Sequence, residues 1–199
     1  MKFRPVENSE YKTLASLHSL AFDDFFLTSL GNKFLRTYYK SVLKSNESIT
    51  SCAVNEEGKM TGFSIGCTHA KGFHKRLVIK FYILFIIQAF WIVFTRPRAI
   101  FRLIKNMDKK ANDQDDGNYA ELLSIAVDPE YKNMGIGKEL IKVFEQEAFK
   151  KGCTRMALTT DYENNDKVIS FYKKVGYDIL SEFTTYPNRR MYKLIKTLP

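Results

Sequence analysis

The sequence is poor in cysteine, and its few cysteines form no pattern. Cys52, Cys67 and Cys153 are odd in number, lie far apart and include no CxxC spacing. This arrangement argues against a disulfide framework, and no group of Cys, His and carboxylate residues has the spacing of metal ligands. We therefore expect reduced thiols in a cytoplasmic protein, and no metal.

Long apolar runs are also lacking. No such run follows the charged residues of the N-terminus, so we do not expect a secretory signal. The most apolar segment, from Leu77 to Phe94, contains Lys80 and Gln88. Its uncharged part, from Phe81 onward, is shorter than the about 20 residues that cross a bilayer. The sequence therefore does not predict a transmembrane helix here.

A basic run follows this apolar segment and consists of Arg96, Arg98, Arg102 and Lys105. Together the two stretches indicate a helical insertion over about 72–117. In one interpretation the insertion packs on the rest of the domain or on a second subunit of a homodimer. In the other, residues 77–105 make a peripheral contact with a membrane, with the apolar side chains in the bilayer surface and the basic ones beside it.

Acidic residues are fewer than basic ones. The chain has 22 Asp and Glu against 31 Lys and Arg, a formal net charge of +9. No zinc-finger spacing or RNA-recognition signature accompanies the basic residues, so a nucleic-acid partner is not expected, whereas a polyanionic ligand such as a nucleotide cofactor fits. With 45% hydrophobic and 27% charged residues, the 199-residue chain has the balance of one folded domain over 1–199.

Hydrophobic periodicity predicts a mixed α/β (α+β) fold with a largely antiparallel central sheet flanked by helices. The helical insertion comes before the central strand. Strands are predicted over 2–7, 48–55, 60–69, 119–127, 154–160, 177–186 and 191–195, and helices over 9–22, 31–44, 135–151 and 166–175.

A glycine-containing loop, Lys132-Asn133-Met134-Gly135-Ile136-Gly137, lies between the strand at 119–127 and an amphipathic helix. Unpaired backbone amides at a helix start, at the positive end of its dipole, can hold a pyrophosphate, and glycine allows close approach. Lys138-Glu139-Leu140 follows, so the loop lacks the continuation typical of dinucleotide or nucleoside-triphosphate sites.

This loop and the preceding Leu123 to Tyr131 resemble the acyl-CoA-binding signature and central strand of the GNAT acetyltransferase superfamily. The stretch from Asn165 through Phe171-Tyr172 to Gly176-Tyr177 resembles its second motif. The likeness covers about 119–177, and residues 72–117 have no counterpart in minimal members. Two positions depart from the family pattern, because Lys132 replaces Arg or Gln and Asn133 stands where many members have Gly.

The resemblance implies that acetyl-CoA is the cofactor and that its pantetheine arm pairs with the backbone of the central strand like an added strand. Lysines near the loop would meet the charged end of the cofactor. The residues that the resemblance assigns to cofactor binding are Ile125, Ala126, Val127, Lys132, Asn133, Met134, Gly135, Ile136, Gly137, Lys138, Asn165 and Tyr172.

The resemblance also implies direct attack of a primary amine on the thioester in a ternary complex. Tyr172 occupies the position of the acid that protonates the departing thiolate, and Glu121 that of the base that takes the amine proton. The amide of Val127 would stabilise the oxyanion. Asp161 and Tyr162 are weaker candidates for the base.

Phe25, Phe26, Tyr38 and Tyr39 lie in the helices that form the acceptor wall in this superfamily. The acceptor is expected to be a small-molecule amine, with a protein amine as an alternative, since the fold does not choose between them. Two other functions stay open: a non-catalytic acyl-CoA-binding regulatory module, and a membrane-associated acyltransferase that uses a longer acyl donor.

Overall fold

The computed structural model describes residues 1–23, 25–95 and 116–199, and in these residues seven strands form one sheet. The strands pair in the order β1-β2-β3-β4-β5-β7-β6. Their bounds are β1 Lys2–Arg4, β2 Ser48–Val54, β3 Met60–Cys67, β4 Ala120–Val127, β5 Arg155–Asp161, β6 Asp178–Thr185 and β7 Arg189–Thr197.

Helices connect these strands in the order that the periodicity predicts, with the addition of the short helix α2, which was not predicted. Gly152 and Gly176, at positive φ, follow the helices that precede β5 and β6, where a left-handed residue ends a helix. The helices are α1 Tyr11–Ala21, α2 Phe26–Ser29, α3 Asn32–Leu43, α4 Phe73–Lys80, α5 Tyr82–Thr95, α7 Ile136–Lys150 and α8 Asp166–Lys174, with short 3-10 turns at Asn8–Glu10 and Pro129–Tyr131.

All neighbouring strands are antiparallel except β4 and β5, which are parallel and joined through α7. The expected mixed, largely antiparallel sheet is confirmed. Several boundaries differ from the sequence prediction: β1 ends at Arg4 rather than at residue 7, and β3 ends at Cys67 rather than at residue 69. Helix α1 begins at Tyr11 rather than Ser9, because residues 8–10 form a 3-10 turn in which Glu10 accepts the Glu7 N–H at 2.8 Å. Strand β7 is longer than predicted and pairs with both β5 and β6.

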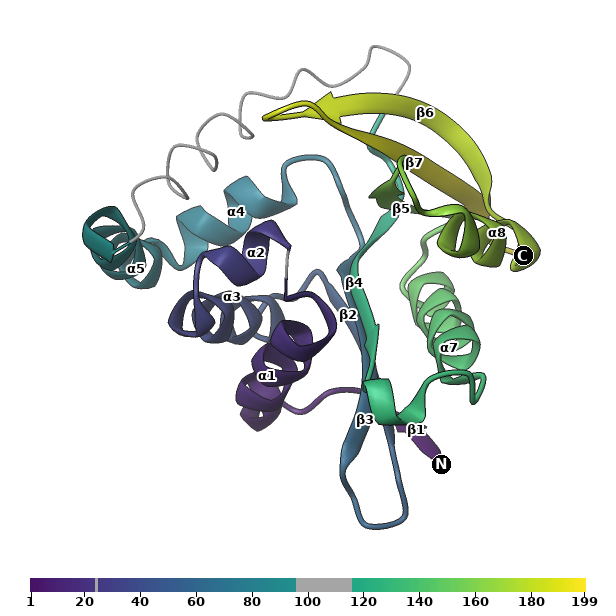
Figure 1. Ribbon diagram of the computed structural model, residues 1–199, viewed down its shortest axis with the longest axis horizontal. Helices are drawn as coiled ribbons and strands as arrows, with labels where there is room; N and C mark the ends of the chain where they lie inside the picture. Colours follow the sequence, from purple (N-terminus) through teal and green to yellow (C-terminus); the bar gives the residue numbers. More distant parts are fainter. Residues whose placement is uncertain (24, 96–115) are drawn as a thin grey trace.

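Two helical layers cover the two faces of the sheet (Figure 1). On one face α1 and α3 pack on the sheet, and the core there includes Leu14, Leu35 and Phe63, all fully buried. On the other face α7 and α8 cover the sheet around Phe144 and Tyr172. The central strand β4 contributes side chains to both cores, so it lies at the centre of the molecule.

The predicted helical insertion is helical where the structure describes it, as α4 and α5 before β4. The predicted basic run lies outside the described residues. Within the described ranges no single helix is both long and apolar enough to cross a bilayer. Helices α4 and α5 together meet that test of length and composition, but they are bent by 95° relative to each other.

Candidate functional site

An opening in the sheet separates the C-terminal halves of β4 and β5. Strand β4 pairs with β3 as far as Val127, but its pairing with β5 ends at Leu122, opposite Leu158. Beyond that point β5 continues along β7 to Asp161. The two strands therefore separate, and the edge of β4 that faces β5 after Leu122 can accept an extended ligand as an added strand.

The alternation of backbone groups decides which residues of β4 face this opening. The Asp128 N–H donates to Thr61 O of β3 at 2.8 Å. Because N–H and C=O groups alternate sides along a strand, Ala126 also points to β3, whereas Ile125 and Val127 point to the open side. Ala126, predicted to bind the cofactor, is thus bonded to β3, and its side chain is buried against the core on the α1–α3 face.

A β-bulge at Leu123 lies where the opening begins. Ile65 of β3 is opposite Ser124 and Gly66 is opposite Leu122, so Leu123 is an extra residue in β4. A Cβ on Gly66 would lie 2.0 Å from Glu121 O, so only glycine allows β3 to approach β4 this closely. The bulge and the close approach fix the direction of β4 as it leaves β5.

The glycine loop begins where the opening ends. Asn133 and Gly135 have φ of 65° and 75°, a left-handed conformation that turns the chain into α7. The first N–H donors of α7 to bond within the helix are those of Lys138 and Glu139, both to Gly135 O. The N–H groups of Ile136 and Gly137 therefore lie at the helix start without an intrahelical acceptor, a site suited to an anion.

Packing fixes this loop against the end of β4. The buried Ile136 side chain packs with Val127 and Tyr131, so only its backbone can reach a ligand. A Cβ on Gly137 would meet Val127 Cγ2 and Phe171 Cζ at 3.9 Å, which is ordinary contact distance, so protein packing does not require glycine there. The side chains of Lys132, Asn133, Met134 and Lys138 are exposed.

Tyr172 lies on α8 inside the core that α8 shares with β4 and β5. It is 6% exposed and packs against Phe171 and Tyr177. In the described part of the chain its hydroxyl makes no hydrogen bond. The fully enclosed side-chain atoms that lack a hydrogen-bond partner there are His18 Nε2 and Ser41 Oγ, and the Tyr172 hydroxyl is not one of them. The Tyr172 hydroxyl therefore keeps some access to solvent. Burial raises the pKa of Tyr172 well above 10, which keeps the phenol protonated at neutral pH.

Asn165 connects the end of β5 to the start of α8. Its Nδ2 donates to Thr160 Oγ1 at 2.7 Å and to Asp161 O at 2.9 Å. Both amide hydrogens are thus used to hold the turn before α8. The side-chain N–H groups of this predicted cofactor-binding residue have a structural role here, which positions the helix that carries Tyr172.

Glu121 lies in β4 one residue before the pairing with β5 ends, between Cys67 of β3 and Ala157 of β5. Burial, with a smaller contribution from the charge of Glu121, raises the pKa of Tyr38 well above 10, so the Glu121 carboxylate lies within electrostatic range of Tyr38. The Tyr38 hydroxyl in turn lies 3.3 Å from His74 Nε2 of α4. The structure therefore brings together groups from β4, α3 and the insertion.

The predicted acceptor aromatics divide into exposed and buried residues. Phe25, at the start of α2, is 40% exposed, while Phe26 packs partly on the core. Tyr38 and Tyr39 are buried, and Tyr39 bonds His18 Nδ1 at 2.6 Å. Tyr39 is therefore a core residue, because the sheet and α1 enclose its ring.

Arg189 is a residue at this site that the sequence did not indicate. Its guanidinium lies 4.9 Å from the ring centroid of Phe25 and makes two hydrogen bonds to Asp161 at the end of β5. This contact links the segment before α2 to the β6–β7 hairpin. No sequence signal could identify it, because the three residues lie far apart along the chain. Because Asp161 is engaged by Arg189, it is a poor candidate for the base.

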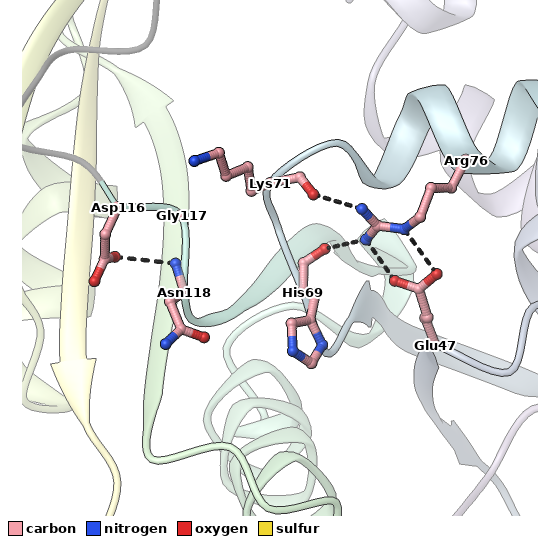
Figure 2. A pocket seen from close by; sticks show the side chains of 7 residues that line it. All are labelled: Glu47, His69, Lys71, Arg76, Asp116, Gly117 and Asn118. Atoms are coloured by element: carbon pink, nitrogen blue, oxygen red, sulfur yellow. Dashed lines mark hydrogen bonds and ion pairs between the residues drawn. The ribbon is translucent and has the colours of Figure 1, made fainter.

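A separate pocket of about 410 Å³ lies at the other end of β4, beside the start of α4 (Figure 2). Arg76 crosses it and donates to Glu47, to His69 O and to Lys71 O. On the other side of the pocket Asp116 accepts from the Asn118 N–H at 3.0 Å. The pocket does not include the glycine loop, Tyr172 or Glu121.

The comparisons with known proteins give the family and the fold of the chain. The profile of the acetyltransferase (GNAT) family matches residues 14–177, and the chain belongs to that family. No curated protein matches the sequence. The match includes the opening, the glycine loop and Tyr172, and it also spans the insertion.

Solved structures share the fold at low sequence identity. A structure described as an acetyltransferase has a TM-score of 0.67 at 15% identity, covering 100% of both chains. The ribosomal-protein-S18-alanine N-acetyltransferase from Escherichia coli has 0.62 at 14%, covering 99% of this chain and 93% of its own. An aminoglycoside 6'-N-acetyltransferase complexed with coenzyme A has 0.62 at 16%, covering 100% and 98%.

Proposed function

We propose that this protein is an N-acetyltransferase that transfers the acetyl group of acetyl-CoA to a primary amine within a ternary complex. The observation that carries the proposal is the opening between β4 and β5, which has the backbone of Ile125 and Val127 along one edge and the glycine loop at its end. An extended arm ending in phosphates fits this combination of an open strand edge and a helix start.

The residues that surround the opening fit the cofactor. Ile125 and Val127 would pair with the amide groups of the pantetheine arm. The N–H groups of Ile136 and Gly137 would hold the pyrophosphate, with the exposed Lys132 and Lys138 nearby. When bound, acetyl-CoA supplies an acetyl group activated as a thioester.

The residues of the chain then supply proton transfers and charge stabilisation. Glu121 takes a proton from the acceptor amine as the new C–N bond forms, and the Val127 N–H stabilises the negative charge on the carbonyl oxygen. As the C–S bond breaks, Tyr172 donates its hydroxyl proton to the thiolate. A tyrosine phenol carries its proton at neutral pH, and burial, which raises the pKa of Tyr172, keeps that proton in place.

The acceptor is a primary amine presented on the α1–α3 face, near Glu121, Tyr38 and the Phe25–Arg189 contact. We keep a small-molecule amine as the prediction. The descriptions of the structural neighbours name both an aminoglycoside and a ribosomal-protein alanine, so similarity of fold does not select between small-molecule and protein acceptors.

Calorimetric titration with acetyl-CoA and free CoA tests the cofactor site. We expect micromolar binding that Gly135→Glu abolishes, because a charged side chain at this left-handed position meets the anion. Gly58→Glu is the matched control, since Gly58 has φ of +80° and an equally open surrounding in the β2–β3 turn. Absence of binding to either ligand by the unmodified protein would contradict the proposal.

Turnover is then measured as release of free CoA over a panel of amines. Acetyl transfer to any amine supports catalysis, whereas binding without turnover on the whole panel supports the regulatory-module alternative. The same assay with a long-chain acyl-CoA in place of acetyl-CoA tests the other alternative, because faster turnover with the long-chain donor would support an acyltransferase that uses a longer acyl group. If Glu121→Gln leaves the turnover and its pH profile unchanged, Glu121 is not the base.

A further inference from the structure

Helix α5 exposes an unusual amount of apolar surface. Phe94, Phe90 and Ile86 are 72%, 63% and 62% exposed, and within α5 only Ile92 is buried. We call the outward-facing side chains the α5 surface, defined by Tyr82, Ile83, Ile86, Phe90, Trp91 and Phe94. In contrast to a surface helix with one apolar stripe, α5 has no polar face towards water.

The exposed apolar residues extend around most of the helix. At about 100° per residue, the side chains that face the protein, Phe85, Gln88 and Ile92, occupy about a third of the circumference. The remaining two thirds, roughly, of the circumference carry apolar side chains along the whole helix except at its last residue, Thr95. A helix of a second protein subunit covers a stripe about 100° wide. Fluid acyl chains surround an embedded helix on all its free sides, so a bilayer covers this wide arc better.

Within the described helices α2, α3, α4 and α5, the charged side chains are all of one sign. These helices contain no Asp or Glu. Lys33, Arg36, Lys75 and Lys80 are exposed on the two helices beside α5, and the Lys33 ammonium lies 5.2 Å from the centre of the Trp91 ring. Cations beside apolar side chains complement a surface of anionic headgroups over acyl chains.

The length and position of α5 indicate how it meets such a surface. Its 14 residues are about 21 Å long, shorter than the ~30 Å hydrocarbon layer. It lies at the edge of the molecule, separated from the sheet by α3 (Figure 1). It is held there by contacts such as that between the rings of Phe34 and Phe85, with 6.1 Å between centroids. The helix can therefore enter the interface without displacing the rest of the protein.

We propose that the α5 surface docks the protein peripherally on a lipid bilayer with anionic headgroups. The α5 helix lies in the interface, its apolar arc among the acyl chains, while Lys33, Arg36, Lys75 and Lys80 contact the headgroups. This proposal concerns a surface outside the acetyl-CoA opening and does not depend on the proposed catalytic function.

The only tryptophan of the sequence, Trp91, lies in the α5 surface and reports on docking directly. The unmodified protein is mixed with vesicles of phosphatidylglycerol and phosphatidylcholine in equal amounts. We expect Trp91 emission to shift to shorter wavelength and to be quenched when the acyl chains carry bromine. Vesicles of phosphatidylcholine alone should bind at least tenfold more weakly, and added salt should reduce the difference.

The paired variant Phe90→Ser and Phe94→Ser should lower the apparent vesicle affinity at least tenfold. Phe149→Ser is the control, because Phe149 is an exposed phenylalanine on α7, in the opposite layer. A circular-dichroism melt checks that the variants fold. Absence of both the emission shift and the quenching by brominated lipid in the unmodified protein overturns the proposal. So does a concentration-dependent dimer that buries Trp91 without lipid and leaves no vesicle binding, because the partner is then a second copy.

Discussion

Helices α7 and α5 cover opposite sides of the molecule and differ in how they meet water. Helix α7 turns Phe144 and Leu140 to the sheet and carries both Glu and Lys on its outer face, with pairs such as Lys150–Glu147 at 2.7 Å. Helix α5 has apolar side chains on its outer face and no charged residue. The outer face of α7 is therefore suited to water, whereas the outer face of α5 leaves apolar side chains exposed.

The two layers also differ in whether their buried polar groups have hydrogen-bond partners. On the α7 side, the Tyr177 hydroxyl donates to Glu145 at 2.9 Å, and Glu145 also accepts from Lys196 at 2.7 Å. On the α1–α3 side, His18 Nε2 and Ser41 Oγ are enclosed without a partner among the described residues. Unpaired buried polar atoms reduce stability, so the two layers should respond differently to substitution and pH.

The largest expected effect comes from truncating one phenylalanine in each helix. Phe144→Ala should lower the free energy of unfolding by about 3–5 kcal/mol, because its ring is fully buried against the sheet and leaves a cavity. Phe90→Ala should change it by less than about 0.5 kcal/mol, since the ring is exposed in the isolated protein. Urea unfolding without lipid measures both. Equal losses would show that α5 is part of a core, and the contrast between the helices would then fail.

A second expected effect concerns the pH dependence of stability. Burial lowers the pKa of His18 from 6.5 to about 4, so the folded state binds the proton more weakly than the unfolded state. Above pH 6.5 His18 is neutral in both states, and its contribution to the free energy of unfolding is complete. As the pH falls from 6.5 towards 4, the unfolded state gains the proton first, and the free energy of unfolding decreases by roughly 3 kcal/mol. Free energies of unfolding from urea titrations between pH 7 and pH 4 test this. His18→Gln should remove this contribution to the dependence of the free energy of unfolding on pH. If the dependence stays unchanged in the variant, groups other than His18 cause it.

A smaller effect is expected for two neighbouring tyrosines of the α8 layer. Tyr172→Phe should lower kcat about 100-fold with unchanged acetyl-CoA affinity, because the thiolate loses its proton donor. Tyr177→Phe should leave kcat unchanged and lower the free energy of unfolding by about 1–2 kcal/mol, because its hydroxyl bonds Glu145. Turnover, calorimetry and urea unfolding distinguish the two outcomes. If both variants lose only stability, Tyr172 is a core tyrosine without a catalytic role.

Most of the fold could be predicted from contiguous patterns. Helix α7 follows from its amphipathic period between Gly135 and Gly152, and the β2–β3 hairpin from the turn at Gly58. Family resemblance, rather than spacing alone, predicted Tyr172 and the role of the glycine loop. The register of β4 was not predictable, because a bulge at Leu123 changes which backbone groups face each neighbour and leaves no mark in the hydrophobic pattern.

The sequence by itself therefore determined the order of the elements, the glycine loop and the presence of an apolar insertion, since each depends on residues close together in the chain. Only the tertiary structure decided that β4 and β5 separate after Leu122 and that the backbone of Ala126 faces β3. It also decided that Tyr39 is buried and that Arg189 joins Phe25 to Asp161. The physical reason is that strand pairing and burial depend on contacts between residues distant in sequence, and local sequence patterns do not predict such contacts.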